Sequence, residues 1–454
     1  MNKTLIALLF LSSAAFAEVK NYPSKTDTLK KLKPMVADVG MADPHIHIFN
    51  NKAYLYATRD GDKTAKTFVM PDWKIWTSTD LVNWKLETTI DPANTYMGKS
   101  NDCWAPDMAH KNGKYYFYFS NGNLNTGVLV GNTPIGPFKD VLRKPLLPEN
   151  LTPGKEYDPT VIIEKDKAKT AYIAFGHYRA ADPTLNYMIA KLNSDMISLA
   201  EKPRKLVIKG SAEGLLACDK PNLHQRNGIY YLSAGTSYAT SKNIYGPYTR
   251  RGYSANIDLY GLNNAAHGNF FEWNNQWFHT WCHFYLGKDV ARYRQSYVNY
   301  LHYKDNGDMV DDTNYLDKHG DIGIGQYDAN WDKIEAEWYM ASAKTDKCEN
   351  TKGGFSLNSN QTGGYLYFPN FKNVEAKTKV TFNVASEKGG IIEIRANAVD
   401  GELLASCVIK STGGKNIYKN ISTKIVRKIK PTGVYIIFKA ADGNLVKLDS
   451  FKFD

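Results

Sequence analysis

Apolar and aromatic residues recur along most of the chain in short runs bounded by polar turns. Five runs share one pattern, a polar turn and then an aromatic-rich strand: "NNKAYLYATRD" at Asn50, "NGKYYFYFSNG" at Asn112, "KTAYIAFGH" at Lys169, "NGIYYLSAG" at Asn227 and "NNQWFHTWCHF" at Asn274. Their spacing of roughly fifty to sixty residues is typical of small antiparallel sheets repeated around an axis. The pattern predicts an all-β fold that begins with a five-bladed β-propeller. A β-sandwich with long insertions explains the repeat less well.

The pattern changes after Asp328. The segment that opens with "WDKIEAEWYMAS" has alternating strands and Gly-rich turns such as "TGGYLYF" and "EKGGIIEIRA". Its length suits an independent β-sandwich, of the jelly-roll kind, over residues 331–454. Since no low-complexity linker precedes it, we expect it to be docked on the propeller, which then spans residues 18–330.

The first residues, "MNKTLIALLFLSSAAFA", have the features of a secretory signal peptide over residues 1–17: Lys3, an apolar run and a small-residue cleavage site. A buried N-terminal helix is the alternative. No later apolar run is long enough to span a bilayer. We therefore expect a secreted or periplasmic protein without a membrane partner.

Composition adds two limits. The formal net charge of +11 could favour anionic polymers, but a solvated lysine-rich surface is the preferred explanation, and no nucleic-acid-binding motif is present. The five cysteines allow at most two internal disulfides, with a pairing that spacing does not reveal, and they form no zinc pattern.

Three acidic residues precede strands in equivalent repeats: Asp43 in "ADPHI", Asp158 in "YDPTVII" and Asp219 in "CDKPNLH". A single Asp-Pro pair is common turn chemistry. However, the innermost strands of a propeller line its axis, so acids at the start of several such strands converge there. In the two Asp-Pro pairs the proline also restricts the approach of the chain to the strand. These acids are the candidate catalytic residues.

The chain resembles glycoside hydrolase family 43 over roughly residues 38–328. The resemblance is carried by "ADPHI", "CWAPDMAHKNGKYYFYFS", "YDPTVII", "NGIYYLSAGTSYATSKNIYGPY" and "AAHGNFFEWNNQWF". It implies a five-bladed propeller that hydrolyses arabinofuranosyl or xylosyl links with inversion and without an organic cofactor. Asp43 matches the general base, and Asp158 matches the residue that orients the general acid and tunes its pKa. Inversion places acid and base about 6.5–9.5 Å apart.

The third carboxylate departs from the family pattern, in which a glutamate lies five residues before the His or Tyr that leads into the "NG-YY" strand. Counting back from His224 gives Asp219, one methylene shorter than a glutamate. Glu213 has the expected side chain but lies six residues earlier. Asp219 is our preferred general acid and Glu213 the alternative.

Other pocket residues follow from the same alignment of repeats. We expect Trp104 and Asp107 in the pocket wall, where an indole face stacks on a sugar. His267 matches the axial histidine of the family, which often lies near a bound calcium ion or water. His45 is a candidate sugar contact. Core packing of Trp104 and His267, and a backbone hydrogen bond from His45, are the alternatives.

Residues 331–454 resemble carbohydrate-binding module family 6, through "IEAEWY", "GGIIEIRANAVDGELLA", "STGG" and "LDSFKFD". The resemblance implies a structural calcium ion held by Glu335, Glu337 and Asp449. Lys415 stands where the family usually has a tryptophan in its sugar cleft, which leaves Tyr365 and Tyr418 as candidate aromatic platforms. A purely structural sandwich is the alternative.

Together these features predict a monomeric exported hydrolase that removes a terminal sugar from a plant-type polysaccharide. An α-L-arabinofuranoside is the preferred substrate, followed by a β-xyloside and then a galactan or galactofuranoside link. A catalytically weak glycan-binding propeller is the competing hypothesis, because the expected glutamate is missing.

Overall fold

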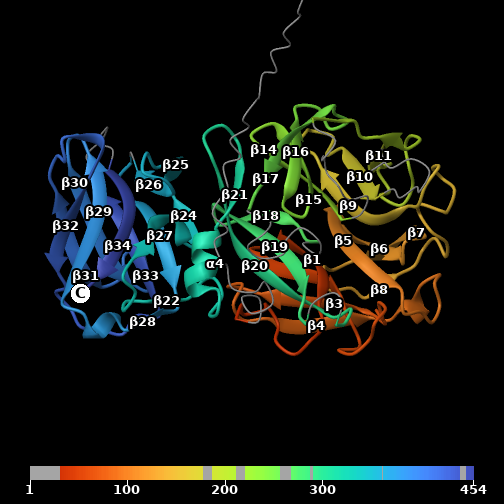
Figure 1. Cartoon of the computed structure of the whole chain (residues 1–454), viewed down its shortest axis with the longest axis horizontal. Coiled ribbons are helices and arrows are strands. Elements are labelled where there is room, and N and C mark those ends of the chain that lie inside the picture. Colours follow the sequence, from red (N-terminus) through yellow and green to blue (C-terminus); the bar gives the residue numbers. More distant parts are fainter. Residues whose placement is uncertain are drawn as a thin grey trace, which may run out of the picture.

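Strands dominate the computed structural model, which describes residues 31–176, 187–210, 220–255, 267–286, 290–359, 361–439 and 446–454. The chain forms a five-bladed β-propeller and a β-sandwich that lie side by side, with the short helix α4 (Thr313–His319) between them (Figure 1). The predicted fold class is therefore confirmed. No helix among these residues is long and apolar enough to cross a membrane.

Each blade is an antiparallel sheet whose strands follow one another in sequence order. Blade 1 consists of β1 (Ala42–Phe49), β2 (Lys52–Thr58), β3 (Trp73–Ser78) and β4 (Lys85–Ile90), and blade 2 of β5 (Cys103–Lys111), β6 (Lys114–Asn121), β7 (Asn125–Gly131) and β8 (Phe138–Lys139). Blade 3 consists of β9 (Tyr157–Ile163), β10 (Ala171–Gly176), β11 (Tyr187–Lys191) and β12 (Arg204–Lys205).

Blade 4 consists of β14 (Pro221–Arg226), β15 (Ile229–Ala234), β16 (Ser237–Ser241) and β17 (Tyr248–Tyr253), with β13 (Ile208–Lys209) added in parallel to β17. Blade 5 consists of β18 (Phe270–Trp273), β19 (Gln276–Phe284), β20 (Arg294–Tyr303) and β21 (Met309–Asp311). Because both faces of each sheet meet a neighbouring blade, apolar residues fill both faces. This is why the strands are aromatic-rich: Tyr118 of blade 2 and Ile173 of blade 3, for example, belong to one buried cluster.

Five polar side chains form a ring around the axis, four at equivalent positions of the innermost strands and the fifth directly before β18. This axial ring consists of His45, Asp107, Thr160, Asn222 and Asn269. Four of them accept a hydrogen bond from a backbone N–H of the next blade. The accepting side chain and the donating N–H are Asp107 and Val161, Thr160 and Leu223, Asn222 and Phe270, and Asn269 and Ile46. His45 contacts Asp107 itself. The blades are therefore joined by polar contacts where the sheets are closest together.

Two hydrogen bonds between Asn269 and Ile46 close the ring between blades 5 and 1. Asn269 accepts from the N–H of Ile46 at 2.9 Å and donates to its C=O at 2.8 Å. By contrast, the links made by Thr160 and Asn222 are 3.4 Å long.

Two sheets form the sandwich. One contains β25 (Asp346–Glu349), β26 (Phe355–Ser359), β34 (Val446–Phe453), β29 (Lys379–Ser386) and β32 (Gly414–Lys424), with β23 (Ile334–Glu335) beside β34. The other contains β24 (Ala341–Ala343), β27 (Gly364–Pro369), β33 (Gly433–Lys439), β30 (Gly390–Ala396) and β31 (Leu403–Ile409). The remaining short elements are β22 (Tyr327–Asp328), β28 (Phe371–Lys372), and the 3-10 turns Pro92–Asn94, Ala336–Trp338 and Val374–Ala376.

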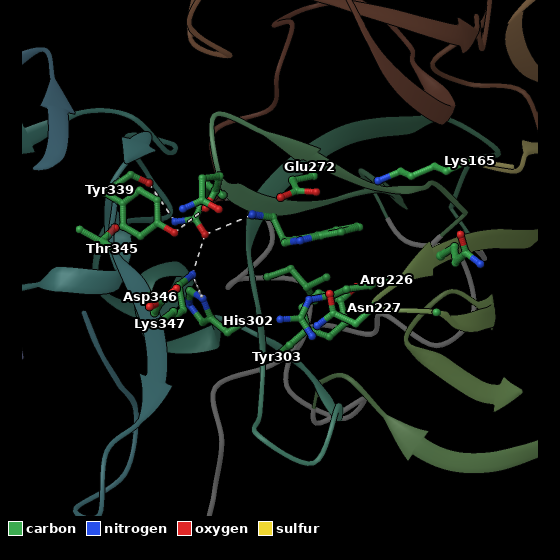
Figure 2. A pocket seen from close by; sticks show the side chains of 16 residues that line it. Lys165, Arg226, Asn227, Glu272, His302, Tyr303, Tyr339, Thr345, Asp346 and Lys347 are labelled. Atoms are coloured by element: carbon green, nitrogen blue, oxygen red, sulfur yellow. Dashed lines mark hydrogen bonds between the residues drawn. The ribbon is translucent and has the colours of Figure 1, made fainter. Parts of the chain in front are cut away.

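The sandwich is docked on the propeller, as the missing linker predicts. Trp338 donates its indole N–H to Asp312, the N-cap of α4, at 2.5 Å, and Gln276 of blade 5 donates to the carbonyls of Glu337 and Tyr339. A cavity of about 510 Å³ lies between the two bodies. At its wall the half-buried Lys347 donates to Gln276 and contacts His302 (Figure 2). The docking surface is thus polar as well as apolar.

Candidate active site

The candidate site lies at the mouth of the propeller axis, where the innermost strands begin. Two residues before each member of the axial ring lie Asp43, Ala105, Asp158, Lys220 and His267, which we call the mouth ring. Asp43 and Asp158 occupy equivalent positions, as expected from the sequence. The third equivalent position belongs to Lys220 instead, because Lys220, and not Asp219, directly precedes Pro221.

Asp43 is buried among charged groups from blade 5. Its Oδ1 lies 2.9 Å from Nη1 of Arg294 and 3.2 Å from Nδ1 of His267. Burial raises the pKa of Asp43, but the Arg294 guanidinium and the His267 ring outweigh it and hold the pKa well below its usual value. Asp43 is therefore ionised, as a general base must be.

Arg294 is a candidate functional residue that sequence reasoning missed. It bridges Asp43 and Asp60, donating to Asp60 through both Nε and Nη2 at 3.0 Å. Burial raises the pKa of Asp60 despite this pairing. The sequence did contain one sign of its role, a single arginine at the start of the aromatic strand "RQSYVNYLHY". A charged residue in a buried strand needs a partner of opposite charge.

Asp158 is positioned by a side chain of blade 2 and by the backbone just before blade 4. Its N–H donates to Oγ of Ser120 at 2.7 Å, and its Oδ2 accepts from the N–H of Lys220 at 2.9 Å. Nδ1 of His267 lies 3.8 Å from the same Oδ2. His267 therefore lies between Asp43 and Asp158 and brings the two acids into one charged group.

The two candidate general acids, Asp219 and Glu213, lie outside the described residues. The structure therefore places Asp43 and Asp158, the candidate base and the candidate orienting residue, while the choice between Asp219 and Glu213 remains a prediction.

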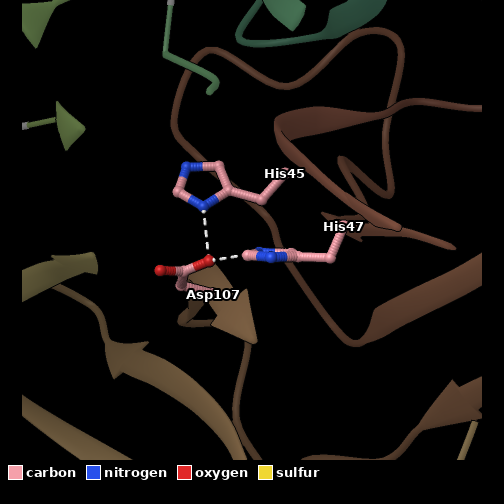
Figure 3. Close-up of side chains that lie close together, drawn as sticks. All are labelled: His45, His47 and Asp107. Carbon is pink, nitrogen blue, oxygen red and sulfur yellow. Dashed lines mark hydrogen bonds and ion pairs between the residues drawn. The ribbon is translucent and has the colours of Figure 1, made fainter. Parts of the chain in front are cut away.

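His45 and Asp107 join blades 1 and 2 below the mouth. Figure 3 shows the Asp107 carboxylate between His45 and His47, with Oδ1 3.0 Å from Nδ1 of His45 and 2.7 Å from Nε2 of His47. The same oxygen accepts from the N–H of Met108 at 2.8 Å. Burial raises the pKa of Asp107, but the two imidazoles lower it well below its usual value. His45 is fully buried, so its contacts suit a link between blades better than a sugar contact.

His45, His47 and Asp107 are also the one group among the described residues with three possible metal ligands within 4.8 Å of one another. Their donor set suits a transition-metal ion such as Zn²⁺. However, the contacts of Asp107 given above are all explained by hydrogen bonds, so they do not require a metal ion. His47, which was not singled out from the sequence, is the exposed member, with 23% of its side chain accessible.

Trp104 directly precedes the mouth-ring residue Ala105 and is partly exposed. Its ring packs edge-on against Phe68 at 5.7 Å between centroids. An indole with one accessible part at the mouth is compatible with the predicted stacking on a sugar.

The two tyrosines predicted as platforms in the sandwich lie on different sheets. Tyr365 belongs to β27 and packs against Tyr435 at 5.6 Å, whereas Tyr418 belongs to β32 and shares a hydrogen bond with Ser356 at 2.8 Å. The structure does not combine them into one platform.

The three predicted calcium ligands line one cavity of about 360 Å³, beside α4 and the turn Gly353–Gly354. Oε2 of Glu337 is buried without a hydrogen-bond partner there, while Oε1 accepts from the N–H of Phe355 at 3.2 Å. Burial and the charges of Glu335 and Asp312 raise the pKa of Glu337 well above its usual value. A buried carboxylate with an unsatisfied oxygen near other carboxylates fits a hard dication. Glu335 also pairs with Lys333, and Asp449 accepts from Asn350.

The four cysteines among the described residues, Cys103, Cys282, Cys348 and Cys407, form no disulfide. Cys282 lies at the site, with Sγ 3.9 Å from Oδ1 of Asp43, and burial raises the pKa of its thiol to about 12. It is therefore a neutral neighbour of the candidate base.

Two relatives of known activity align with nearly the whole chain, and a third aligns with about half of it. The chain is 28% identical to an arabinoxylan arabinofuranohydrolase of Paenibacillus polymyxa, covering 98% of this chain and 79% of the relative. It is 26% identical to one of Bacillus subtilis, covering 91% and 90%. A xylosidase/arabinosidase of Bacteroides ovatus is 28% identical over 47% of this chain and 77% of its own.

Solved structures agree on the fold. A family 43 arabinoxylan arabinofuranohydrolase from Bacillus subtilis in complex with cellotetraose superposes with a TM-score of 0.54 at 24% identity, covering 93% of this chain and 97% of its own. A family 43 enzyme from Xanthomonas citri in complex with xylotriose gives 0.53 at 25% identity, covering 63% and 95%. The model of carbohydrate binding module family 6 matches residues 335–454, and that of glycosyl hydrolases family 43 matches residues 33–307, more than half of the chain. The protein belongs to glycosyl hydrolase family 43.

Proposed function

We propose that this protein removes α-L-arabinofuranosyl groups from an arabinoxylan-type polysaccharide by inverting hydrolysis. The observation that carries the mechanism is the pair Asp43 and Asp158 at the mouth, with His267 between them. The arabinofuranohydrolases that align with nearly the whole chain support the substrate.

In the proposed mechanism, Asp43 takes a proton from water as that water attacks the anomeric carbon. Arg294 and His267 keep the base ionised and fix its orientation. Asp158 orients the acid, which protonates the leaving oxygen on the other face of the sugar. The acid is Asp219, with Glu213 as the alternative. Trp104 forms part of the sugar-binding wall.

The reaction is tested by incubating the protein with arabinoxylan and following the anomeric protons of the released sugar by NMR. An inverting enzyme gives the β anomer first, and mutarotation then adds the α anomer. Release of xylose instead of arabinose would favour the β-xylosidase alternative. If the wild type binds the polymer but releases no sugar from any substrate of a glycoside panel, the glycan-binding alternative is correct.

The acid is identified by comparing two leaving groups, because a general acid matters most when the leaving group needs a proton. Asp219→Asn should abolish most activity on the polysaccharide but retain activity on a dinitrophenyl glycoside, whose leaving group departs unprotonated. Glu213→Gln should change both only modestly. The opposite result would assign the acid to Glu213.

We further propose a structural calcium ion at Glu335, Glu337 and Asp449, for which the orphaned Oε2 of Glu337 is the support. The part of the site near His267 fits calcium less well, because calcium prefers oxygen ligands and His267 directs Nδ1 at Asp43. We also propose that the leader at residues 1–17 directs export, that the protein is a monomer, and that the sandwich binds glycan.

A further inference from the structure

We propose that the cavity between the propeller and the sandwich binds a sugar that carries a carboxylate, at a second site away from the catalytic mouth. Its volume of about 510 Å³ lies within the range of about 300–1,000 Å³ that is usual for small-molecule sites. The proposal is supported by the place of the cavity in the fold, by the charges on its wall and by its aromatic rings.

The cavity lies at the end of the propeller opposite the mouth. The innermost strands begin at the mouth, and the lining residues of the propeller come from the far ends of these strands and the segments that follow. Arg226 is the last residue of β14, Glu272 lies near the end of β18, and Lys165 follows β9. Tyr339 and Lys347 of the sandwich line the other side (Figure 2). A ligand here would contact both bodies and leave the mouth free.

Cations outnumber acids on the wall of the cavity: Lys165, Arg226 and Lys347 against Glu272 and Asp346. Within the part of the chain that the structure describes, none of these five side chains forms an ion pair. Unpaired cations favour an anionic ligand, and the planar guanidinium of Arg226 suits a carboxylate through two parallel hydrogen bonds. The two acids accept hydrogen bonds from hydroxyl groups. The wall therefore suits a ligand that has both a carboxylate and hydroxyl groups.

The ammonium of Lys347 has a donor to spare. It donates to Oε1 of Gln276 at 2.7 Å and contacts Nδ1 of His302 at 2.9 Å. Burial lowers the pKa of His302 to about 4, so this ring is a neutral acceptor. An ammonium has three N–H groups, and among the described residues the third has no partner. Burial also lowers the pKa of Lys347 to about 7, and a bound carboxylate would offset this effect.

Aromatic rings distinguish this cavity from a simple anion site. Trp277 lines it, is partly exposed and packs edge-to-face on Tyr303 at 5.2 Å between centroids. Cζ of Arg226 lies 4.3 Å from the centre of the Tyr303 ring, which holds the guanidinium at the wall. Thr345 also lines the cavity, and its buried hydroxyl has no hydrogen-bond partner. An indole face beside a guanidinium suits the C–H face and the carboxylate of one sugar ring.

The test compares methyl β-D-glucuronide with methyl β-D-glucoside, which has a hydroxymethyl group in place of the carboxylate. Binding to the full chain is titrated by saturation-transfer NMR at about pH 6, where Lys347 is protonated. We expect the glucuronide to bind about tenfold more tightly than the glucoside, the effect of one charge-assisted hydrogen bond. It should also bind about tenfold more tightly than acetate, which lacks the sugar ring. Equal affinity of the glucuronide and either of the other ligands overturns the proposal.

Two arginines provide matched variants. Arg226→Gln removes the guanidinium at the cavity and should weaken glucuronide binding about tenfold. Arg204→Gln removes a guanidinium that also lies over a tyrosine ring, 4.2 Å from the centre of Tyr245, but outside the cavity, and should leave binding unchanged. Unchanged binding in Arg226→Gln, or an equal loss in Arg204→Gln, overturns the proposal. Lys165 is exposed, so Lys165→Gln should fold even if Arg226→Gln does not. It should weaken binding about two- to fivefold, and no change would equally overturn the proposal.

The outcome is independent of the proposed hydrolysis, because binding is measured without turnover. Arg226→Gln should keep wild-type kcat on an aryl arabinofuranoside, since Arg226 lies at the far end of the propeller. A loss of kcat as large as the loss of binding would place the glucuronide at the mouth and overturn the second site. A wild type that binds the glucuronide but hydrolyses no glycoside would disprove the proposed function and support the site.

Discussion

At the scale of single residues, the state of Asp43 is decided by its neighbours on blade 5. Arg294 and His267 contact one carboxylate oxygen and keep the group ionised. We expect Asp43→Asn to lower kcat on arabinoxylan by about 10²–10⁴-fold, the range for loss of a general base. The control is Asp62→Asn, an exposed acid in the same blade that should keep wild-type turnover. Near wild-type kcat in Asp43→Asn would show that Asp43 is a turn residue without a catalytic role.

We expect Arg294 to support stability as well as the proposed catalysis, because its removal leaves Asp60 and Asp43 buried without their cation. Arg294→Met should lower the free energy of unfolding by about 3–5 kcal/mol, as for other broken buried ion pairs. Urea denaturation measures the change. Adding Asp60→Asn to this variant should recover part of the loss, since the second change removes one of the unpaired charges. A double variant less stable than Arg294→Met would contradict the assignment.

At the scale of elements, the axial ring determines how firmly each blade holds the next. Asn269→Ala leaves both the N–H and the C=O of Ile46 without a partner, and each buried orphan costs about 1–3 kcal/mol. Thr160→Val removes one 3.4 Å contact and should cost less than about 1 kcal/mol. Thermal melting of the two variants provides the comparison. Equal losses would show that the ring contributes little to closure.

At the scale of the whole molecule, the proposed calcium site lies where the sandwich meets the propeller, because Asp312 and Thr313 line the same cavity as Glu337. An acid whose folded pKa is raised destabilises the folded state as the pH rises above its unfolded pKa of about 4.3. Calcium should offset this penalty. We therefore expect added calcium to raise the Tm of the full chain, and to raise it more at pH 7 than at pH 4.5. The control is Glu337→Gln, in which the calcium response should be lost; a chelator without effect on the wild-type Tm would remove the calcium proposal.

The repeat in the sequence was sufficient to predict the propeller, because five aromatic strands at regular spacing have few other solutions, and the change of pattern after Asp328 predicted the sandwich. The same repeat located Asp43 and Asp158, since a residue before Pro44 or Pro159 has a fixed place in the strand. It was one residue wrong about the third position, where Lys220 stands between Asp219 and Pro221. Arg294 and His47 were missed because their partners are distant in sequence: 251 residues separate Arg294 from Asp43, and 60 separate His47 from Asp107.

The axial ring also restricts how such a propeller can be recombined. Each member has a side chain matched to the blade that adjoins it: Asp107 accepts from the imidazoles of blade 1, and Asn269 both donates to and accepts from one peptide of that blade. A chimera that exchanged blade 2 alone for one with an apolar residue at this position would leave His45 facing no acceptor. Chimeras of related sequences should therefore fold where both residues of an axial contact come from the same parent. A few polar atoms at the axis thus encode the order of the blades.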